Sequence, residues 1–347
     1  MQICMRKTIW ILCCLLSVMV CILSFPHSAL TAETDAEKAL VEGAKKEGKV
    51  LWYTAITANE AAILLNKFHE KYPFIETEMY RGGSENVLVK ILTEASMKRH
   101  AWDVVLETGA ESEILNRKGL YAKYQSPHRK FYDEGSKDAE GFWTDFYMNL
   151  NVICYNTKLV SPQEVPKTYE DLLAPRWNGK MGMDTKAYEW YYYVLRQMGE
   201  KKGLEFMKKL GEQNIAFRTG RTLNVQMVAA GEINLSITTY NQRVEAMRAK
   251  GASINWTAIE PVIPEIHPVA VSAFAPHPNA ARLLVDYLLS KEGQTVIASF
   301  YRIPSRTDVD PIIPTMKRGL KIMKPSFGMV DNYDKYTKLY RETLMRK

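Results

Sequence analysis

The alternation of short apolar runs with amphipathic segments between residues 49 and 117 most constrains how this chain can fold. The runs KVLWYTA, IETEMY and WDVVLE have the length and the β-branched and aromatic content of strands. The segments between them place apolar residues at helical spacing, and in ENVLVKILTEASMK positions 87, 88, 91, 92 and 95 fall on one face. Strands that alternate with helices predict an α/β fold built on mainly parallel sheets.

A second alternation follows the first. The run FYMNLNVICYNTKLV predicts a long strand that leaves the first unit, and strand-like and helix-like segments then alternate from KMGMD to NQRVEAMRAKG. The run HPVAVSAFAP predicts a further strand, which leads into one long helix, NAARLLVDYLLSKEGQTVIASF. We therefore expect two α/β lobes joined by two crossover strands. Residues 33–146 and 271–347 form the first lobe, and residues 147–270 form the second.

The first 32 residues differ from the rest of the chain. A basic pair precedes an apolar stretch at positions 8–25, and small residues then lead to Ala32. This layout predicts a signal peptide at residues 1–32 and a periplasmic mature protein, with an uncleaved membrane anchor as the alternative. Cleavage would leave Cys154 as the one cysteine, so no internal disulfide is expected, and Cys154 is interpreted as a small buried apolar residue.

Charge and motifs argue against several classes of function. The formal charge is +7 at pH 7, but basic and acidic residues alternate, as in EGAKKEGK, which is typical of solvated helix faces. We therefore expect no nucleic-acid partner. The sequence has no phosphate loop ending in Gly-Lys-Ser/Thr and no Gly-x-Ser-x-Gly elbow, so no enzyme activity is expected. Its histidines form no HxxH or HxxxH pair, and we expect no catalytic residue, metal site or cofactor.

Ligands of parallel α/β sheets bind beyond the carboxyl ends of the strands, beside helix N-termini. Three loops of the first alternation occupy such positions, at residues 54–59, 81–84 and 107–111. Backbone N–H groups at the helix that begins near Ser84 would favour negative charge. The candidate ligand-binding residues of this half are Tyr53, Thr54, Thr57, Ser84 and Thr108.

Four segments resemble a known family. They are GKVLWYTA, WDVVLETG, VICYNTKLVSPQEVPKTYEDLLAPRWNGKMGM and NAARLLVDYLLSKEGQTVIASFYRIPSR. They resemble the periplasmic solute-binding proteins of ABC importers, in the type 2 group that includes ferric-iron, thiamine, polyamine and organophosphonate binders. The resemblance covers roughly residues 38–310 and implies the two-lobed type 2 periplasmic-binding-protein fold.

The same resemblance implies a mechanism and partners. A small-molecule solute would bind between the lobes, close the hinge, and be delivered to an ABC permease in the inner membrane by a monomeric binding protein. A periplasmic sensor subunit that reports ligand occupancy to a receptor would use the same closing lobes, and it stays an alternative.

The ferric binders resemble this chain most, so iron is the first ligand to consider. They use adjacent tyrosines after a strand of the second lobe, usually with a histidine in the first loop. Here the strand INLSITTY ends in Tyr240 followed by Asn241, and the first loop, TAITANEA, has no histidine. An amide cannot replace an anionic phenolate on a hard trivalent ion. A small polar or anionic organic solute is therefore the leading expectation, and ferric iron is the alternative.

Further candidates lie at helix starts of the second half. The ferric relatives hold a synergistic anion at the loop that corresponds to DTKAYEW, and in RTGRTLN we favour Thr222 over its neighbour Arg221. Arg243 could bind a carboxylate or phosphonate through two parallel hydrogen bonds. The candidate ligand-binding residues of this half are Asp184, Thr185, Lys186, Tyr188, Thr222, Tyr240, Asn241 and Arg243.

Overall fold

The computed structural model describes residues 35–345, so the expected signal peptide at 1–32 lies outside the described residues. The chain divides into two units, Met1–Ala39 and Leu40–Lys347, and every contact reported below lies within the second. After α2 (Asp35–Glu47), strands and helices alternate as predicted. The elements are β1 (Lys49–Thr54), α3 (Ala58–Lys71), β2 (Glu76–Arg81), α4 (Ser84–Ser96), β3 (Val104–Leu106) and α5 (Gly109–Arg117).

The second alternation is also present. After β4 (Thr144–Asn156), the elements are β5 (Met181–Asp184), α6 (Tyr188–Met198), α7 (Glu200–Gly211), β6 (Ala216–Arg218), α8 (Arg221–Ala230), β7 (Leu235–Tyr240), α9 (Asn241–Arg248), β8 (Ile254–Thr257), β9 (Pro264–Val271), α10 (Pro278–Leu289), α11 (Lys291–Ser299), β10 (Ile303–Pro304) and α12 (Tyr333–Leu344). Short 3₁₀ helices occupy parts of the connections, at Pro127–Phe131, Glu134–Ser136, Glu170–Leu173, Pro175–Trp177, Pro314–Met316 and Val330–Asn332.

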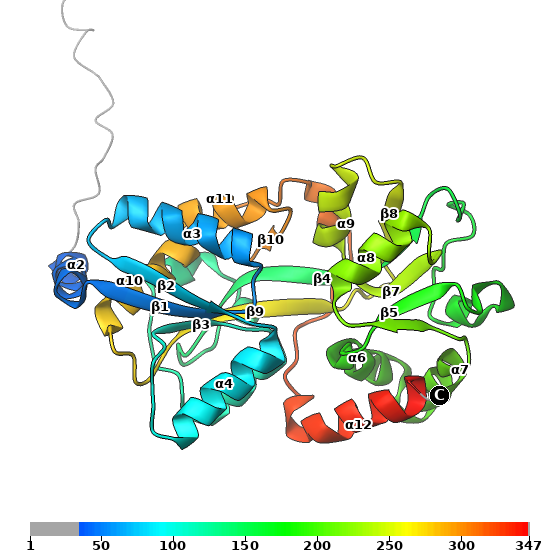
Figure 1. The fold of residues 1–347 in the computed structure, drawn as a ribbon, viewed down its shortest axis with the longest axis horizontal. Helices are drawn as coiled ribbons and strands as arrows, with labels where there is room; N and C mark the ends of the chain where they lie inside the picture. Colours follow the sequence, from blue (N-terminus) through cyan, green and yellow to red (C-terminus); the bar gives the residue numbers. More distant parts are fainter. Residues whose placement is uncertain (1–34, 346–347) are drawn as a thin grey trace, which may run out of the picture. The chain divides into compact units, whose positions relative to one another are not determined.

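The ten strands within residues 35–345 form one sheet, whose main path runs β2-β1-β3-β9-β4-β7-β5-β6, with β8 and β10 paired to β4. In the first half, β1 is parallel to β2 and β3; in the second half, β5 is parallel to β6 and β7. The antiparallel pair β4 and β9 connects the two halves (Figure 1). The predicted two-lobed α/β fold with two crossover strands is therefore confirmed.

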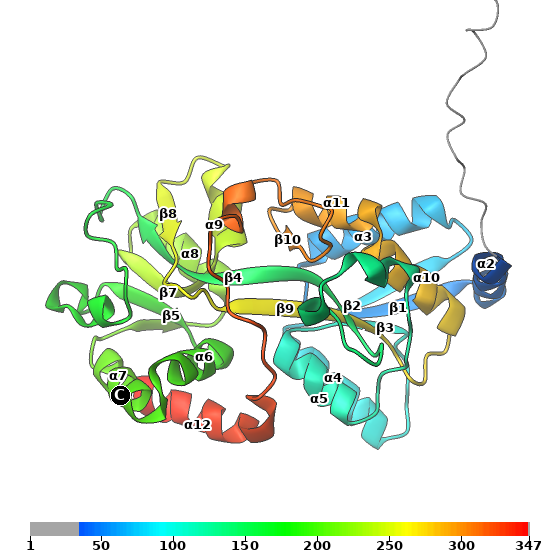
Figure 2. The same ribbon diagram turned by 180° about the vertical axis from the view of Figure 1, so that it is seen from behind.

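Alternating side chains of β1 build cores on both faces of the first half of the sheet. Val50 and Trp52 pack in one buried cluster with residues of α3, α10 and α11. Tyr53 packs in the opposite cluster with Val87 of α4 and Leu115 of α5. In Figures 1 and 2 the two sets of helices lie on opposite faces. The predicted alternation is thus present: helices cover both faces of the sheet, and the carboxyl ends of β1, β2 and β3 lead into loops.

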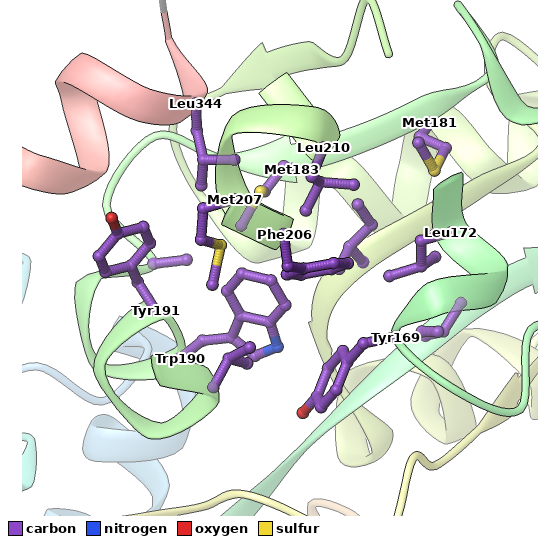
Figure 3. Packing of buried hydrophobic residues seen from close by; sticks show 14 of the residues in the cluster. Tyr169, Leu172, Met181, Met183, Trp190, Tyr191, Phe206, Met207, Leu210 and Leu344 are labelled. Atoms are coloured by element: carbon purple, nitrogen blue, oxygen red, sulfur yellow. The ribbon is translucent and has the colours of Figure 1, made fainter. Parts of the chain in front are cut away.

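An aromatic cluster fills one face of the second half (Figure 3). Trp190 of α6 lies there with Met207 of α7 and Leu344 of α12, and its ring meets that of Tyr169 at a centroid distance of 6.0 Å. The neighbouring run Tyr191–Tyr193 is buried within the same cluster. Adjacent tyrosines inside a helix therefore serve packing here, as their spacing predicts.

The C-terminal helix corrects the predicted lobe assignment. Residues 271–347 were all expected in the first lobe, and α10 does pack there. Helix α12 instead packs on α6 and α7 of the second half. The reason is its apolar face, because Tyr340 and Leu344 complete the buried cluster that α6 and α7 leave open.

The long helix predicted after β9 is also corrected. It is two helices, α10 and α11, which meet at Ser290. The Ser290 hydroxyl accepts a hydrogen bond from the backbone N–H of Gly293 at 3.1 Å and caps the second helix, as a serine at a helix N-terminus commonly does. None of the helices within residues 35–345 is long and apolar enough to cross a membrane.

Candidate functional site

A cavity of about 290 Å³ lies where the first turns of several helices converge. Helices α4 and α5 reach it from the first half of the sheet, and α6 and α8 reach it from the second half. Its wall is formed by Gly83, Ser84, Glu85, Asn86, Thr108, Ala110, Glu111, Asp184, Lys186, Tyr188, Glu189, Thr219, Gly220, Arg221, Glu265, Met329 and Tyr333. The position agrees with the rule that ligands of such sheets bind beyond the strand ends.

Five of the predicted site residues lie on this wall: Ser84, Thr108, Asp184, Lys186 and Tyr188. Ser84 is the first residue of α4, and Thr108 is the N-cap of α5. Asp184 ends β5, and its carboxylate accepts a hydrogen bond from the backbone N–H of Lys186 at 2.9 Å. The side chain of Lys186 forms an ion pair with a glutamate of α4, so this loop of the second half touches the first half.

The predicted residues of β1 and the first loop are not on the cavity wall. Tyr53 is buried under α4, where its hydroxyl donates to Glu94 at 3.0 Å. Thr54 is fully buried, and its hydroxyl accepts a hydrogen bond from the backbone N–H of Ile56 at 3.2 Å. Thr57 is the N-cap of α3. The cavity is instead reached from the loops after β2 and β3.

Three predicted residues of the second half also point elsewhere. The hydroxyl of Thr185 shares a hydrogen bond with that of Thr219 at 2.9 Å, and Thr222 is exposed outside the cavity. Arg243 is held beside Glu60 and Arg302, where burial and the charge of Arg302 lower its pKa. None of these three residues lines the cavity, although Thr185 is hydrogen-bonded to the wall residue Thr219.

Tyr240 and Asn241 have structural partners rather than open faces. The Tyr240 hydroxyl donates to the Glu265 carboxylate, and the Arg221 guanidinium lies 4.3 Å from the centre of the Tyr240 ring. Arg221 also pairs with Glu265 at 3.2 Å. The Asn241 amide donates to the carbonyl oxygen of Met316 at 2.9 Å and is fully buried. Tyr240 thus supports the wall from behind Glu265, and Asn241 binds the protein itself.

Carboxylates dominate the charge of the wall. The acids are Glu85, Glu111, Asp184, Glu189 and Glu265, and the bases are Lys186 and Arg221. Burial and repulsion from Glu265 and Glu111 raise the pKa of Glu189 well above its usual value. Burial also raises the pKa of Glu111, with repulsion from Glu265 adding to the effect. The cavity wall therefore carries more acidic than basic side chains.

One further carboxyl lies just behind the wall. Glu107 is fully buried next to Thr108, and its carboxylate accepts a hydrogen bond from the backbone N–H of Thr108 at 3.3 Å. Burial and the charge of Glu111 raise the pKa of Glu107 well above its usual value, although a hydrogen bond with Ser84 acts in the opposite direction. Glu107 thus forms hydrogen bonds with two wall residues, Thr108 and Ser84, and helps to hold them in place.

Sequence reasoning did not select Glu111, Glu189, Arg221, Glu265 or Tyr333. Acids in the first turn of a helix are common because they complement the helix dipole, so Glu111 and Glu189 carry no distinguishing signal. Arg221 and Thr222 are neighbours at one helix start, and the helix phase, which sequence does not fix, decides that Arg221 faces the cavity. Glu265 belongs to β9, which begins at Pro264 and not at the predicted His267.

The comparisons with known proteins agree with the fold. Residues 112–321 match the model of the family described as bacterial extracellular solute-binding proteins. A Haemophilus influenzae protein described only as uncharacterized is 25% identical over 289 residues, which cover 77% of this chain and 80% of that protein.

Two solved structures are similar in fold. Iron-bound HitA from Pseudomonas aeruginosa has a TM-score of 0.77 at 20% identity, over 85% of this chain and 99% of that chain. AfuA from Actinobacillus pleuropneumoniae with bound fructose-6-phosphate has a TM-score of 0.76 at 20% identity, over 86% of this chain and 99% of that chain. Because the family model matches more than half of the sequence, the chain belongs to the bacterial extracellular solute-binding proteins, a non-enzymatic family whose members take up a small solute and work with an ABC permease.

Proposed function

We propose that this protein captures a small polar organic solute in the 290 Å³ cavity and delivers it to the permease of an ABC importer. The observation that carries the proposal is the cavity itself, which receives polar groups from both halves of the sheet. Its volume lies at the lower end of the range of about 300–1,000 Å³ for small-molecule sites, so it suits a small ligand.

The wall favours a polar solute over a purely anionic one. Both cations of the wall already have carboxylate partners, because Lys186 pairs with Glu85 and Arg221 pairs with Glu265. An incoming anion would compete with these partners and would face the remaining carboxylates. The N–H groups in the first turn of α4, beside Ser84, can donate hydrogen bonds to one acceptor group of the solute.

Contacts between the two halves explain how such a solute would be retained. The ion pair between Glu85 and Lys186 and the hydrogen bond from the Tyr333 hydroxyl to Glu111, at 3.3 Å, both join the first half to the second at the wall. A solute that touches both sides adds contacts that exist only when the halves are close. It therefore shifts the protein towards the closed form, which is the form expected to dock on the permease.

Ferric iron is the second candidate, since HitA binds it on the same fold. Residues 35–345 contain no group of three or more His, Cys, Asp and Glu side chains arranged to hold a metal ion. In addition, Asn241 follows Tyr240 where the ferric relatives are expected to have a second tyrosine. These two observations support an organic solute over iron in this proposal.

A thermal-shift screen of the mature protein with organic acids, amines, phosphonates, sugars and ferric citrate tests the proposal, because ligand binding to the folded state raises the melting temperature. Ser84→Trp should remove the ligand-induced shift by filling the cavity, whereas Ser96→Trp, at the exposed far end of the same helix, should retain it. Equal shifts in both variants would contradict the cavity as the site. A visible tyrosinate-to-iron absorption band would favour iron instead.

A further inference from the structure

The cavity holds three carboxylates that reach it from three different elements. Glu111 comes from the first turn of α5, Glu189 from the first turn of α6, and Glu265 from the beginning of β9. Their elements belong to different parts of the sheet, so no single helix start explains why they share one wall. Their convergence is a property of the folded cavity.

The three carboxylates differ in how far the protein satisfies them. Glu265 accepts from the Tyr240 hydroxyl and pairs with Arg221, and Glu111 accepts from the hydroxyls of Thr108 and Tyr333. Glu189 has no hydrogen bond or ion pair with any described residue, although it is only half-buried and faces the cavity. The carboxylate of Glu189 is thus available to a ligand, and it lies beside two carboxylates that hydrogen bonds already orient.

The charged groups around Glu189 within residues 35–345 do not include an unpaired cation. Its neighbours are Glu265, Glu111 and Arg221, and the single cation among them is already paired with Glu265 at 3.2 Å. Both Glu189 and Glu111 have raised pKa values, first because of burial and then because of repulsion between carboxylates. A positive charge placed in the cavity would relieve this repulsion, and the other cation of the wall, Lys186, is already paired with Glu85.

We propose that the solute carries an ammonium group, which binds among the carboxylates of Glu111, Glu189 and Glu265. This inference rests on the proposed function, that the cavity is the solute site. An ammonium group has three N–H donors that diverge, and three carboxylates from separate elements can each accept one of them. The rings of Tyr188 and Tyr333 also line the cavity, and aromatic faces attract organic cations.

The geometry favours an ammonium group over a metal ion. A metal ion needs its ligands within about 2–2.6 Å, whereas an ammonium group donates hydrogen bonds to oxygens at about 2.7–3 Å. No three acidic or histidine side chains among residues 35–345 lie close enough together for a metal ion. The carboxylates therefore suit a larger cationic group that is part of an organic molecule.

Pairs of probes that differ in the amino group test this inference. We would measure binding of putrescine and its diol analogue, and of aminoethylphosphonate and ethylphosphonate, by calorimetry and by thermal shift at millimolar concentrations. At least one amine should bind, and its amine-free analogue should bind at least about tenfold more weakly, since a charge-assisted hydrogen bond is lost. Glu189→Gln should weaken the same amine by about tenfold, and the matched control Glu205→Gln, on the exposed side of α7, should not.

A second readout separates recognition of charge from a merely structural role. Binding of an ammonium group lowers the raised carboxyl pKa values, so protons should be released, and the calorimetric heat should depend on the ionisation enthalpy of the buffer. Glu189→Gln should reduce the number of protons released. Absence of proton release for a bound amine would overturn the proposal.

The remaining outcomes distinguish failure of the ammonium inference from failure of the proposed function. If an amine-free solute binds and Ser84→Trp abolishes its binding, the cavity is the solute site and the ammonium inference is wrong. If Ser84→Trp leaves the binding of every solute intact, the proposed function itself is wrong. Failure of every amine to bind at millimolar concentration would also overturn the inference.

Discussion

Replacing Glu189 by glutamine should stabilise the ligand-free protein at neutral pH. Binding sites often carry groups that are unfavourable until the ligand arrives, and Glu189 fits that description. Its carboxylate has no partner among the described residues, and it faces Glu111 and Glu265 across the cavity. Glutamine keeps the shape of the side chain and removes its charge.

The expected magnitude follows from the surroundings of the side chain. No hydrogen bond or ion pair of Glu189 with a described residue is lost, and the new amide can bind water because the side chain is only half-buried. Removing the charge of this partly solvated, unpaired carboxylate should therefore raise the free energy of unfolding by about 1 kcal/mol, at the lower end of the usual range for a buried unsatisfied group. For a chain of 347 residues, that corresponds to a rise in melting temperature of about 1–2 °C.

The sign of the pH dependence follows from the raised pKa of Glu189. The folded protein holds its proton more tightly than the unfolded chain, whose carboxyl has the ordinary pKa of 4.5. The stabilisation of the protonated form is fully present below that value and is lost as pH rises through the folded pKa. Glutamine does not titrate, so the advantage of the variant should be smallest in acid and should grow as pH rises.

Thermal unfolding of wild type, Glu189→Gln and Glu205→Gln across the acid to neutral range checks this prediction. Glu205 is exposed on α7, so its replacement should leave the melting temperature nearly unchanged at every pH. The reasoning would be refuted if Glu189→Gln lowered the melting temperature at neutral pH, or if its effect did not change with pH.

Other predictions concern the scaffold. Glu60→Ala should cost about 3–5 kcal/mol, because it leaves the buried Arg302 without its partner at 2.7 Å, and the double variant with Arg302→Met should recover most of that loss in urea unfolding. Leu344→Ala should cost about 2–5 kcal/mol in the same assay, since Leu344 is buried in the core under α12, whereas the exposed Leu223→Ala should change stability by less than about 0.5 kcal/mol. The Cys154 thiol, whose pKa burial raises, should react with a thiol reagent only after unfolding, and rapid reaction of the folded protein would contradict its placement.

The sequence was sufficient to predict the layered architecture. Alternating residues in β1, such as Val50 and Tyr53, segregate to opposite faces, and this period of two survives any shift of a strand boundary by a residue or two. The position of α12 was not predictable in the same way. Its apolar face needs a partner, but the sequence does not say which open cluster it will cover.

The candidate site was predicted in part because only some of its information is local. Ser84 and Thr108 follow strand ends and lie on the wall, whereas Thr57, which also follows a strand end, does not. The choice of Arg221 over Thr222 depends on the helix phase at one terminus. The role of Glu265 depends on Tyr240 and Arg221, which reach it from β7 and α8, so it exists only after the sheet has formed.

The strand end that carries Tyr240 has a defined set of partners. Burial and the adjacent carboxylate raise the pKa of Tyr240 well above its usual value, even though Arg221 acts in the opposite direction. Tyr240 is thus a neutral donor that orients Glu265. The Glu265 carboxylate that it orients lines the cavity together with Glu189, where the proposed ammonium group would bind.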